Sequence, residues 1–188
     1  ATIDAGLTPD WMIAGHGSVW VANYNSATVT RIDPDRSAVA ATIEVGEGPR
    51  WLAVGEDAMW VSNYDSVMRI DPATSKVVAT IDVGKTPGSL VVDADAVWVA
   101  TAAGVVRVDA ATNEVSGTVA FAEPPGWLAA VDGEVWASVG DRVVRIDRAG
   151  HAIAAEVRAG GKADWRGTGA GELWVTSAGS GTVTQIEA

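Results

Sequence analysis

The side chains best suited to bind a ligand lie in one short motif that recurs along the chain. Pro-x-Trp ends at Trp11, Trp51 and Trp127, Ala-Asp-Trp ends at Trp165, and Ser89 takes the equivalent place in Pro-Gly-Ser. Flat indole faces suit sugar rings, planar ligands and cationic groups. Indoles at one position of a repeat therefore favour an aromatic binding site, with Ser89 as a gap through which a ligand or water could enter.

Charged residues accompany three of the five motifs. Asp10 and Asp164 precede the Trp of the first and fifth motifs, Arg50 precedes that of the second, and Arg166 follows that of the fifth. A pair of carboxylates flanked by Arg can bind a cation, or act as acid and base if one pKa is raised. The alternative is an ordinary solvated rim of surface charges.

The composition excludes several classes of partner. The formal net charge of the 188-residue chain is −11, which opposes binding to nucleic acid or to an anionic membrane. No apolar run approaches the roughly 20 residues of a membrane-spanning helix, and the sequence does not begin with a signal peptide. We therefore expect no nucleic-acid partner, no membrane insertion and a monomer.

Metal and cofactor chemistry also have little support. The chain has no Cys and only two His, His16 and His151, which fall in turns that do not recur in the other repeats. No phosphate-binding loop, zinc spacing or calcium loop is present. We predict no cofactor and no metal site.

The motifs must be positioned by a tandem repeat. The segments SVWVANY, AMWVSNY, AVWVATA, EVWASVG and ELWVTSA carry Trp20, Trp60, Trp98, Trp136 and Trp174, at spacings of 38 to 40 residues. Each repeat contains four short segments rich in Val, Ile and Thr, separated by turn residues. Four-stranded repeats of about 40 residues are typical of β-propeller blades. The sequence predicts an all-β, five-bladed β-propeller of four-stranded antiparallel blades, with almost no helix.

The order of the segments also predicts how the ring closes. The chain begins with ATIDAG, which matches the outer strand of the other repeats, whereas the fifth repeat ends before an outer strand. We expect residues 1–6 to complete the last blade, which would hide a strand edge and place the termini close together. Residues 1–188 then form a single domain.

The stretch VWVANYNSATVTRIDPDRSAVAATIEVGEGPRWLAVG, from Val19 to Gly55, resembles the YVTN-type β-propeller repeat and, more loosely, the repeats of streptogramin (virginiamycin B) lyases. Many proteins of these groups are extracytoplasmic, so the resemblance implies an extracytoplasmic or secreted protein. The lyases carry Glu-x-His and another His around a magnesium ion. Here Ala14 and Ala149 stand two residues before His16 and His151, so the resemblance does not extend to that chemistry.

In a propeller, the connection into each inner strand shares a face with the turn between the second and third strands. The motif Trp residues should therefore gather at one channel mouth, with Asn23, Tyr24, Asn63 and Tyr64 close by. An aromatic pocket with a few polar groups is the usual form of a small-molecule site. The alternative is that these Trp residues pack between blades.

These observations favour a non-enzymatic propeller that holds a small molecule, a glycan or a peptide. An alternative is a lyase-like or glycan-cleaving enzyme that uses Asp10, Asp164 and Arg166. A third possibility is an interaction or sensor module of a longer protein, which an exposed apolar patch would favour.

Overall fold

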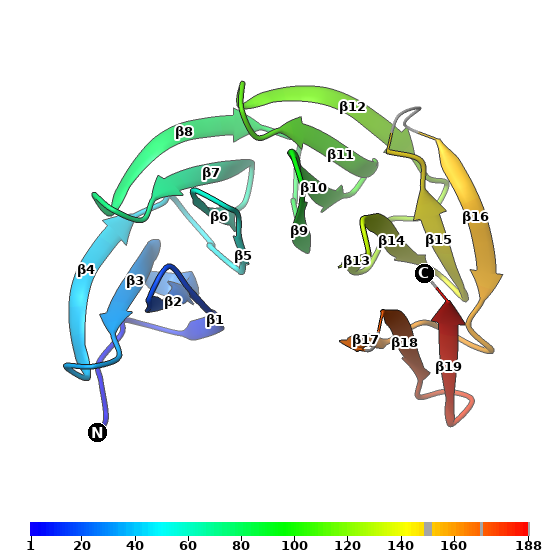
Figure 1. Ribbon diagram of the computed structural model, residues 1–188, viewed down its shortest axis with the longest axis horizontal. Coiled ribbons are helices and arrows are strands. Elements are labelled where there is room, and N and C mark those ends of the chain that lie inside the picture. The colour runs from blue at the N-terminus through cyan, green and yellow to red at the C-terminus, as the bar shows by residue number, and fades with distance from the viewer. Residues whose placement is uncertain (149–151, 170, 188) are drawn as a thin grey trace. The chain divides into compact units, whose positions relative to one another are not determined.

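The computed structural model describes residues 1–148, 152–169 and 171–187, and the side chain of Trp165 lies outside the description. The regular structure of these residues is almost entirely β, with nineteen strands and one 3-10 turn, η1 (Tyr24–Ser26) (Figure 1). No helix in these residues is long and apolar enough to cross a membrane. The predicted all-β fold with almost no helix is confirmed.

The chain divides into two compact units, Ala1–Leu90 and Val91–Ala188. The first unit contains two four-stranded antiparallel sheets, in which each strand pairs with the next along the chain. The strands of the first sheet are β1 (Pro9–Gly15), β2 (Ser18–Asn23), β3 (Thr28–Asp33) and β4 (Ala38–Glu44). Those of the second sheet are β5 (Trp51–Val54), β6 (Met59–Ser62), β7 (Ser66–Asp71) and β8 (Lys76–Asp82).

The second unit repeats this pattern. One four-stranded sheet comprises β9 (Leu90–Asp93), β10 (Ala96–Thr101), β11 (Gly104–Asp109) and β12 (Glu114–Ala120). The next comprises β13 (Leu128–Val131), β14 (Glu134–Val139), β15 (Arg142–Ile146) and β16 (Ile153–Arg158). The last has three strands, β17 (Trp165–Gly169), β18 (Glu172–Ser177) and β19 (Thr182–Glu187).

The mid-strand Trp is buried in the first four repeats. Trp20 is fully buried beside residues of the second sheet in the first unit. In the second unit, Trp98 and Trp136 are each buried against residues of the following sheet. Trp174, in the last sheet, is 40% exposed. The exposure of Trp174 indicates that a following sheet is what normally covers this position.

A short segment, Arg-Ile-Asp or Arg-Val-Asp, recurs at the end of the third strand of the first four sheets, and its Arg packs over the mid-strand Trp of the same sheet. These residues are Arg31, Arg69, Arg107 and Arg145. The guanidinium carbon of each lies 5.4–6.0 Å from the centre of the indole ring. The pairing with the outer strand shifts directly after this Arg in all four sheets. A bulge at this position increases the local twist. The Arg residues are therefore part of the scaffold.

Residues 1–6 form no strand, in contrast to the expected fourth strand of the last sheet. In the first unit, Leu7 donates its backbone N–H to the Ser26 hydroxyl at 2.7 Å, and the Thr30 hydroxyl donates to the carbonyl of Ala5. These bonds hold the segment against the first sheet. The described residues therefore form four-stranded sheets, as predicted, and one three-stranded sheet, and their strand pairings include no closed sheet.

Candidate functional site

The first unit brings four aromatic side chains together from its two sheets. The rings of Trp11 and Trp51 lie 4.5 Å apart between centroids, at an interplanar angle of 46°. The rings of Tyr24 and Tyr64 lie 5.9 Å apart at 74°, and their hydroxyl groups share a hydrogen bond. In both pairs each residue contacts its equivalent in the next repeat. The repeat thus places the predicted Trp and Tyr residues in one cluster, within this unit.

A cavity of about 170 Å³ opens beside this cluster. Its lining consists of Tyr24, Gly48, Arg50, Trp51, Asn63, Tyr64, Thr86, Pro87 and Gly88. An apolar cavity of about 150 Å³ is known to accept benzene in another protein. The cavity therefore has room for a ligand about as large as one six-membered ring.

Gly48 allows Tyr64 to lie flat against the main chain at this cavity. Gly48 has φ +66°, and a Cβ atom there would stand 2.9 Å from Cε2 of Tyr64. The backbone of Tyr64 is fixed as well, because its N–H donates to the Glu47 carbonyl and its carbonyl accepts from the N–H of Thr86. One wall of the cavity is therefore held by main-chain bonds although the Tyr64 side chain is exposed.

The hydroxyl pair changes the acid–base behaviour of Tyr64. The hydrogen bond to Tyr24 is the main cause of a raised pKa at Tyr64, and the nearby carboxylate of Glu47 raises it further while Arg50 lowers it. An ordinary Tyr already titrates near pH 10. Tyr64 is therefore neutral at physiological pH and keeps its hydroxyl hydrogen.

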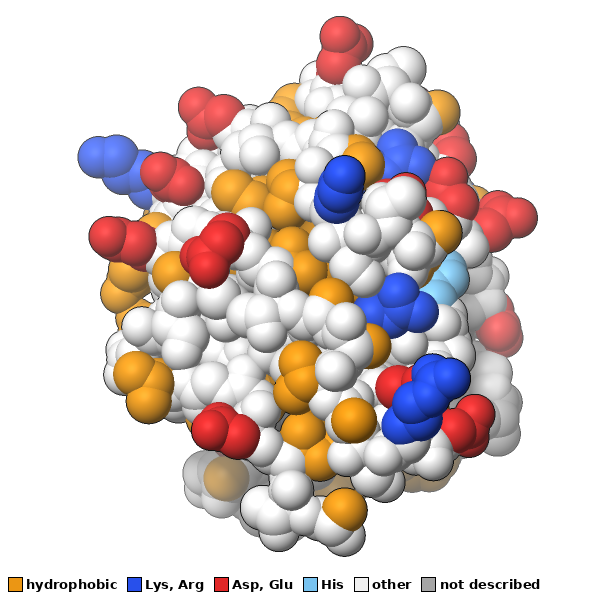
Figure 2. Space-filling view, turned by 90° about the vertical axis from the view of Figure 1, so that its left-hand side faces the viewer, with side chains coloured by type: hydrophobic (Ala, Val, Ile, Leu, Met, Phe, Trp, Pro, Cys, Tyr) orange, Lys and Arg blue, Asp and Glu red, His pale blue; other side chains and the backbone are white. Residues whose placement is uncertain are grey.

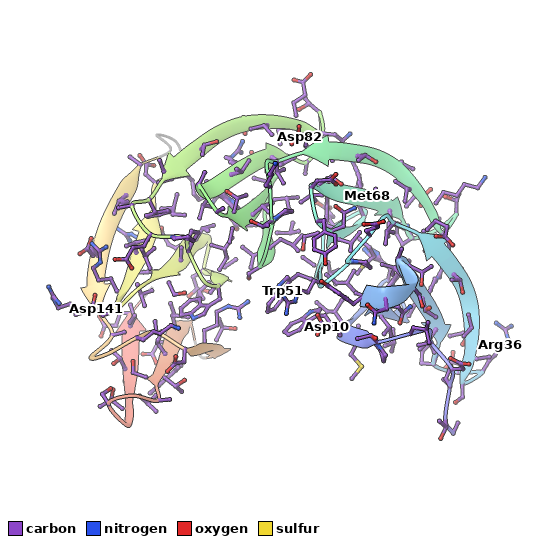
Figure 3. All side chains as sticks on the ribbon, turned by 180° about the vertical axis from the view of Figure 1, so that it is seen from behind. Asp10, Arg36, Trp51, Met68, Asp82 and Asp141 are labelled. Carbon is purple, nitrogen blue, oxygen red and sulfur yellow. The ribbon has the colours of Figure 1, made fainter. Side chains whose placement is uncertain are left out.

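Arg50 supplies the charged group of the cavity. Its Nε donates to Oδ2 of Asp10 at 3.2 Å, and both side chains are exposed. Exposed ion pairs of this kind contribute about 0–1 kcal/mol. Asp10 and Trp51 lie close together at the same end of the unit (Figure 3). The predicted association of Asp10 with an Arg is thus present between neighbouring sheets.

Asn23 and Asn63, predicted beside the ligand, have structural roles. Both are buried. The Asn63 amide donates to the Val45 carbonyl at 2.7 Å, and its Oδ1 accepts from the backbone N–H and the hydroxyl of Ser66. The amide of Asn23 donates to the hydroxyls of Thr28 and Thr30. These side chains shape the turns that carry Tyr24 and Tyr64, and this use leaves Asn63 little capacity to bind a ligand.

The other predicted aromatic positions differ from Trp11 and Trp51. Ser89 is buried in the first unit. In the second unit, Trp127 is 6% exposed, belongs to the core and donates its indole N–H to the Ala163 carbonyl at 3.3 Å. The side chain of Trp165 lies outside the described residues. At Trp127 the geometry agrees with the packing interpretation.

The charged residues of the fifth motif, Asp164 and Arg166, contact other residues of the second unit. Asp164 accepts a hydrogen bond from the backbone N–H of Ala178 at 2.7 Å, so its carboxylate holds the turn between β18 and β19. The guanidinium of Arg166 lies 5.5 Å from the centre of the Trp127 ring, and burial lowers its pKa. Asp10, in contrast, contacts Arg50 in the first unit.

His16 belongs to no metal-binding group in the part of the chain that the structure describes. His16 lies in the turn between β1 and β2, as expected, with Nε2 3.1 Å from the Gly55 carbonyl oxygen. His151 lies outside the described residues. No group of three His, Asp or Glu side chains within the described ranges could hold a metal ion.

A larger and more open hollow of about 720 Å³ also has Tyr64 in its lining. Glu47, Asp65, Asp82 and Lys85 contribute to its lining. On the face shown in Figure 2, acidic side chains are dispersed among basic and apolar ones rather than gathered into one patch. Tyr64 is the one aromatic residue in the lining of this hollow, whereas Tyr24, Trp51 and Tyr64 all line the smaller cavity.

Sequence reasoning missed the contribution of Gly48, Thr86, Pro87 and Gly88 to the cavity. These residues lie in the connections that precede the inner strands β5 and β9. The Gly and Pro content of both connections was visible, but it indicated turns and gave no sign of a cavity wall.

Residues 35–160 match the family described as "Domain of unknown function (DUF5074)". The predicted membership of the YVTN-type family is not confirmed by this match. Among curated proteins, none is significantly similar to the chain.

Solved structures resemble the chain along almost its whole length. A streptogramin B lyase is 18% identical, with a TM-score of 0.77 over 95% of this chain and 64% of its own. BamB from Moraxella catarrhalis is 18% identical, with a TM-score of 0.73 over 94% of this chain and 56% of its own. Hydrazine synthase of Kuenenia stuttgartiensis is 15% identical, with a TM-score of 0.74 over 97% of this chain and 65% of its own.

The chain therefore spans less than two thirds of each of these solved chains. The lyase and BamB are both β-propeller proteins, which supports β-propeller character for the chain. Identities this low concern the fold alone.

Proposed function

The chain belongs to the DUF5074 family, which is described as a domain of unknown function, and from its geometry we propose that it is a non-enzymatic binding domain for a small molecule. The ligand occupies the aromatic cavity of the first unit. The observation that carries this proposal is the cavity itself, about 170 Å³ beside paired Trp and Tyr rings. Aromatic walls with a few polar groups are the usual character of such sites.

Enzymatic use of Asp10 and Asp164 has weaker support. Asp10 pairs with Arg50, and Asp164 accepts a backbone N–H in a turn. Neither carboxylate belongs to the lining of the cavity. The size of the cavity also favours a single small molecule over a longer glycan or peptide.

Binding of benzyl alcohol, a neutral probe with one ring, tests the proposal. Ligand-observed NMR should show binding to the wild-type chain and at least tenfold weaker binding to W51A and Y64A, because each removes an aromatic wall. V78A is the control, since it removes an exposed apolar side chain of the same unit that does not belong to the lining of the cavity. Circular dichroism checks that each variant is folded. Equal binding to the wild type and W51A would refute the proposal, and so would the absence of binding of every one-ring probe, neutral or charged.

We propose further that the fold is a closed five-bladed propeller in which residues 1–6 pair with β19. Two features of the second unit support closure: the last sheet has three strands, and its core Trp174 is 40% exposed. The segments Ala41–Thr42–Ile43 and Ala79–Thr80–Ile81 belong to outer strands and have the same sequence as residues 1–3.

The observed register predicts the pairing at the closure. Ile43 pairs with Val29, and Ile81 pairs with Val67. By the same alignment, Ile3 should pair with Val183 on β19. The chain has no native Cys, so a new disulfide can report this pairing without interference.

The double variant I3C/V183C should form an intramolecular disulfide under mild oxidation, because paired Cα atoms lie within disulfide range. The control I3C/T184C should not, since Thr184 points to the opposite face of the strand. Mass spectrometry of the non-reduced protein distinguishes the outcomes. A disulfide-linked dimer would show that a second copy takes this place, and no cross-link would refute the closure.

A further inference from the structure

The polar groups that line the aromatic cavity of the first unit are mainly hydrogen-bond donors. Arg50 uses Nε for Asp10, and neither of its terminal NH2 groups makes a hydrogen bond to the described residues. The hydroxyls of Tyr24 and Tyr64 share one hydrogen bond, so one hydroxyl hydrogen of the pair is left to donate. No Asp or Glu belongs to the lining.

Two acceptors of the lining are already engaged. Oδ1 of Asn63 accepts from Ser66, and the Gly88 carbonyl accepts from the hydroxyl of Ser62 at 3.0 Å. A neutral sugar or a cationic group needs acceptors, whereas an anion needs donors. The balance of the lining therefore favours an anionic ligand, although the chain as a whole is acidic.

From this lining we infer that the ligand is a small aromatic carboxylate, an inference that rests on the proposed binding function. Its ring contacts Trp51 and Tyr64, and its carboxylate accepts two parallel hydrogen bonds from the terminal NH2 groups of Arg50. The planar guanidinium matches a carboxylate in this bidentate geometry. The existing bond from Nε to Asp10 orients the guanidinium without occupying those two groups.

The volume agrees with this class of ligand. One aromatic ring fits within about 170 Å³, and Arg50, whose side chain is exposed, belongs to the same lining. An ordinary Tyr is already protonated at neutral pH, and the hydrogen bond to Tyr24 raises the pKa of Tyr64 further. The site therefore carries no negative tyrosinate that would repel a carboxylate.

Three probes with one ring and different charges test the inference: benzoate, benzyl alcohol and benzylamine. Titrations by ligand-observed NMR at low salt should show that benzoate binds the wild type at least tenfold more tightly than the other two. In R50Q the preference for benzoate should disappear, because the charge-assisted hydrogen bonds to the carboxylate are lost. R50K should retain part of it, since Lys keeps the charge but lacks the bidentate fork.

R36Q is the matched control, because it removes one exposed Arg of the same unit that pairs with Asp33 away from the cavity. It should retain the preference for benzoate, which separates the local effect of Arg50 from that of net charge. Thermal unfolding followed by circular dichroism confirms that the variants fold.

Equal binding of all three probes would overturn the carboxylate inference and leave the binding function intact. Tighter binding of benzylamine would overturn it as well and would show that the acidic charge of the chain dominates. Failure of every probe to bind would refute both the inference and the proposed function.

Discussion

Tyr24 and Tyr64 donate and accept one hydrogen bond between their hydroxyl groups, from equivalent turns of neighbouring sheets in the first unit. Neither turn could form this bond alone, because each contributes one phenol. The bond links the two repeats at the point where the cavity opens.

This bond makes the titration of Tyr64 sensitive to Tyr24. In Y24F the pKa of Tyr64 should fall toward the ordinary value near 10, because the main cause of its rise is removed. The chain has only two Tyr residues, so the ultraviolet titration of Y24F reports Tyr64 alone. Wild type should show one phenol that ionises above the ordinary range. An unchanged Tyr64 titration in Y24F would show that the bond does not form in solution.

The raised pKa also has a consequence for stability. The folded state favours the protonated phenol, so this contribution is complete below the unfolded pKa of about 10 and is lost as pH rises through the folded value. The difference in stability between wild type and Y24F should therefore shrink above pH 10.

Three Asp residues, Asp33, Asp71 and Asp109, should make the fold less stable in acid. Hydrogen bonds from the Thr74 hydroxyl and then from the Ala73 N–H lower the pKa of Asp71, and backbone hydrogen bonds lower those of Asp33 and Asp109. Each lowered pKa stabilises the fold above the unfolded value of about 3.9, and this stability is lost as pH falls through the folded value.

Urea unfolding of wild type and D71N at pH 7 and pH 3 measures this effect. D71N should be less stable at pH 7 and should lose less stability on acidification than wild type. D35N is the control, because Asp35 is exposed and its carboxylate accepts no hydrogen bond in the described part of the chain. Equal acid sensitivity of D71N and wild type would contradict the role of Asp71.

The repeat explains why so much of the first unit could be predicted. Trp20, Trp98 and Trp136 occupy the same mid-strand position of their repeats, and all three are buried. The alignment of the repeats also matches Trp11 with Trp51 and Tyr24 with Tyr64, and the rings of each pair are in contact. Contacts between equivalent positions follow from stacking one sheet on the next, so they need no knowledge of the loops.

The sequence could not distinguish the individual roles of the aligned residues. Trp51 lines the cavity while Trp127 is buried, because only Trp127 packs among Ala159, Ala163 and Leu173 of the second unit. Asn63 stands beside Tyr64 in the sequence, yet its amide turns inward to Val45. These differences depend on side-chain packing and on where hydrogen-bond partners lie, which a shared motif does not specify.

The buried amide of Asn63 predicts a large effect on stability. N63A should reduce the free energy of unfolding by about 1–3 kcal/mol, since it leaves the Val45 carbonyl and the Ser66 N–H without this partner. N25A is the control, because the Asn25 amide bonds the Thr8 hydroxyl at an exposed position, and it should cost less than about 0.5 kcal/mol. Urea unfolding measures both. Similar losses in the two variants would contradict the structural role of Asn63.

Gly48 and Gly17 provide a matched pair that isolates the contact with Tyr64. Their φ angles are +66° and +68°, so a side chain strains the backbone equally at both. A Cβ at Gly48 would lie 2.9 Å from the Tyr64 ring, whereas one at Gly17 would meet no atom within 4 Å. G17A should cost about 1–2 kcal/mol from backbone strain. G48A should cost at least about 1 kcal/mol more, because the ring must move.

The two variants should also differ at the cavity. Displacement of the Tyr64 ring in G48A should weaken benzyl alcohol binding and lower the pKa of Tyr64, because the bond to Tyr24 is disturbed. G17A should bind the probe as wild type does, since Gly17 lies in the turn between β1 and β2. Equal stability losses together with unchanged binding in G48A would show that Tyr64 does not rest on Gly48, and would remove the fixed wall of the proposed site.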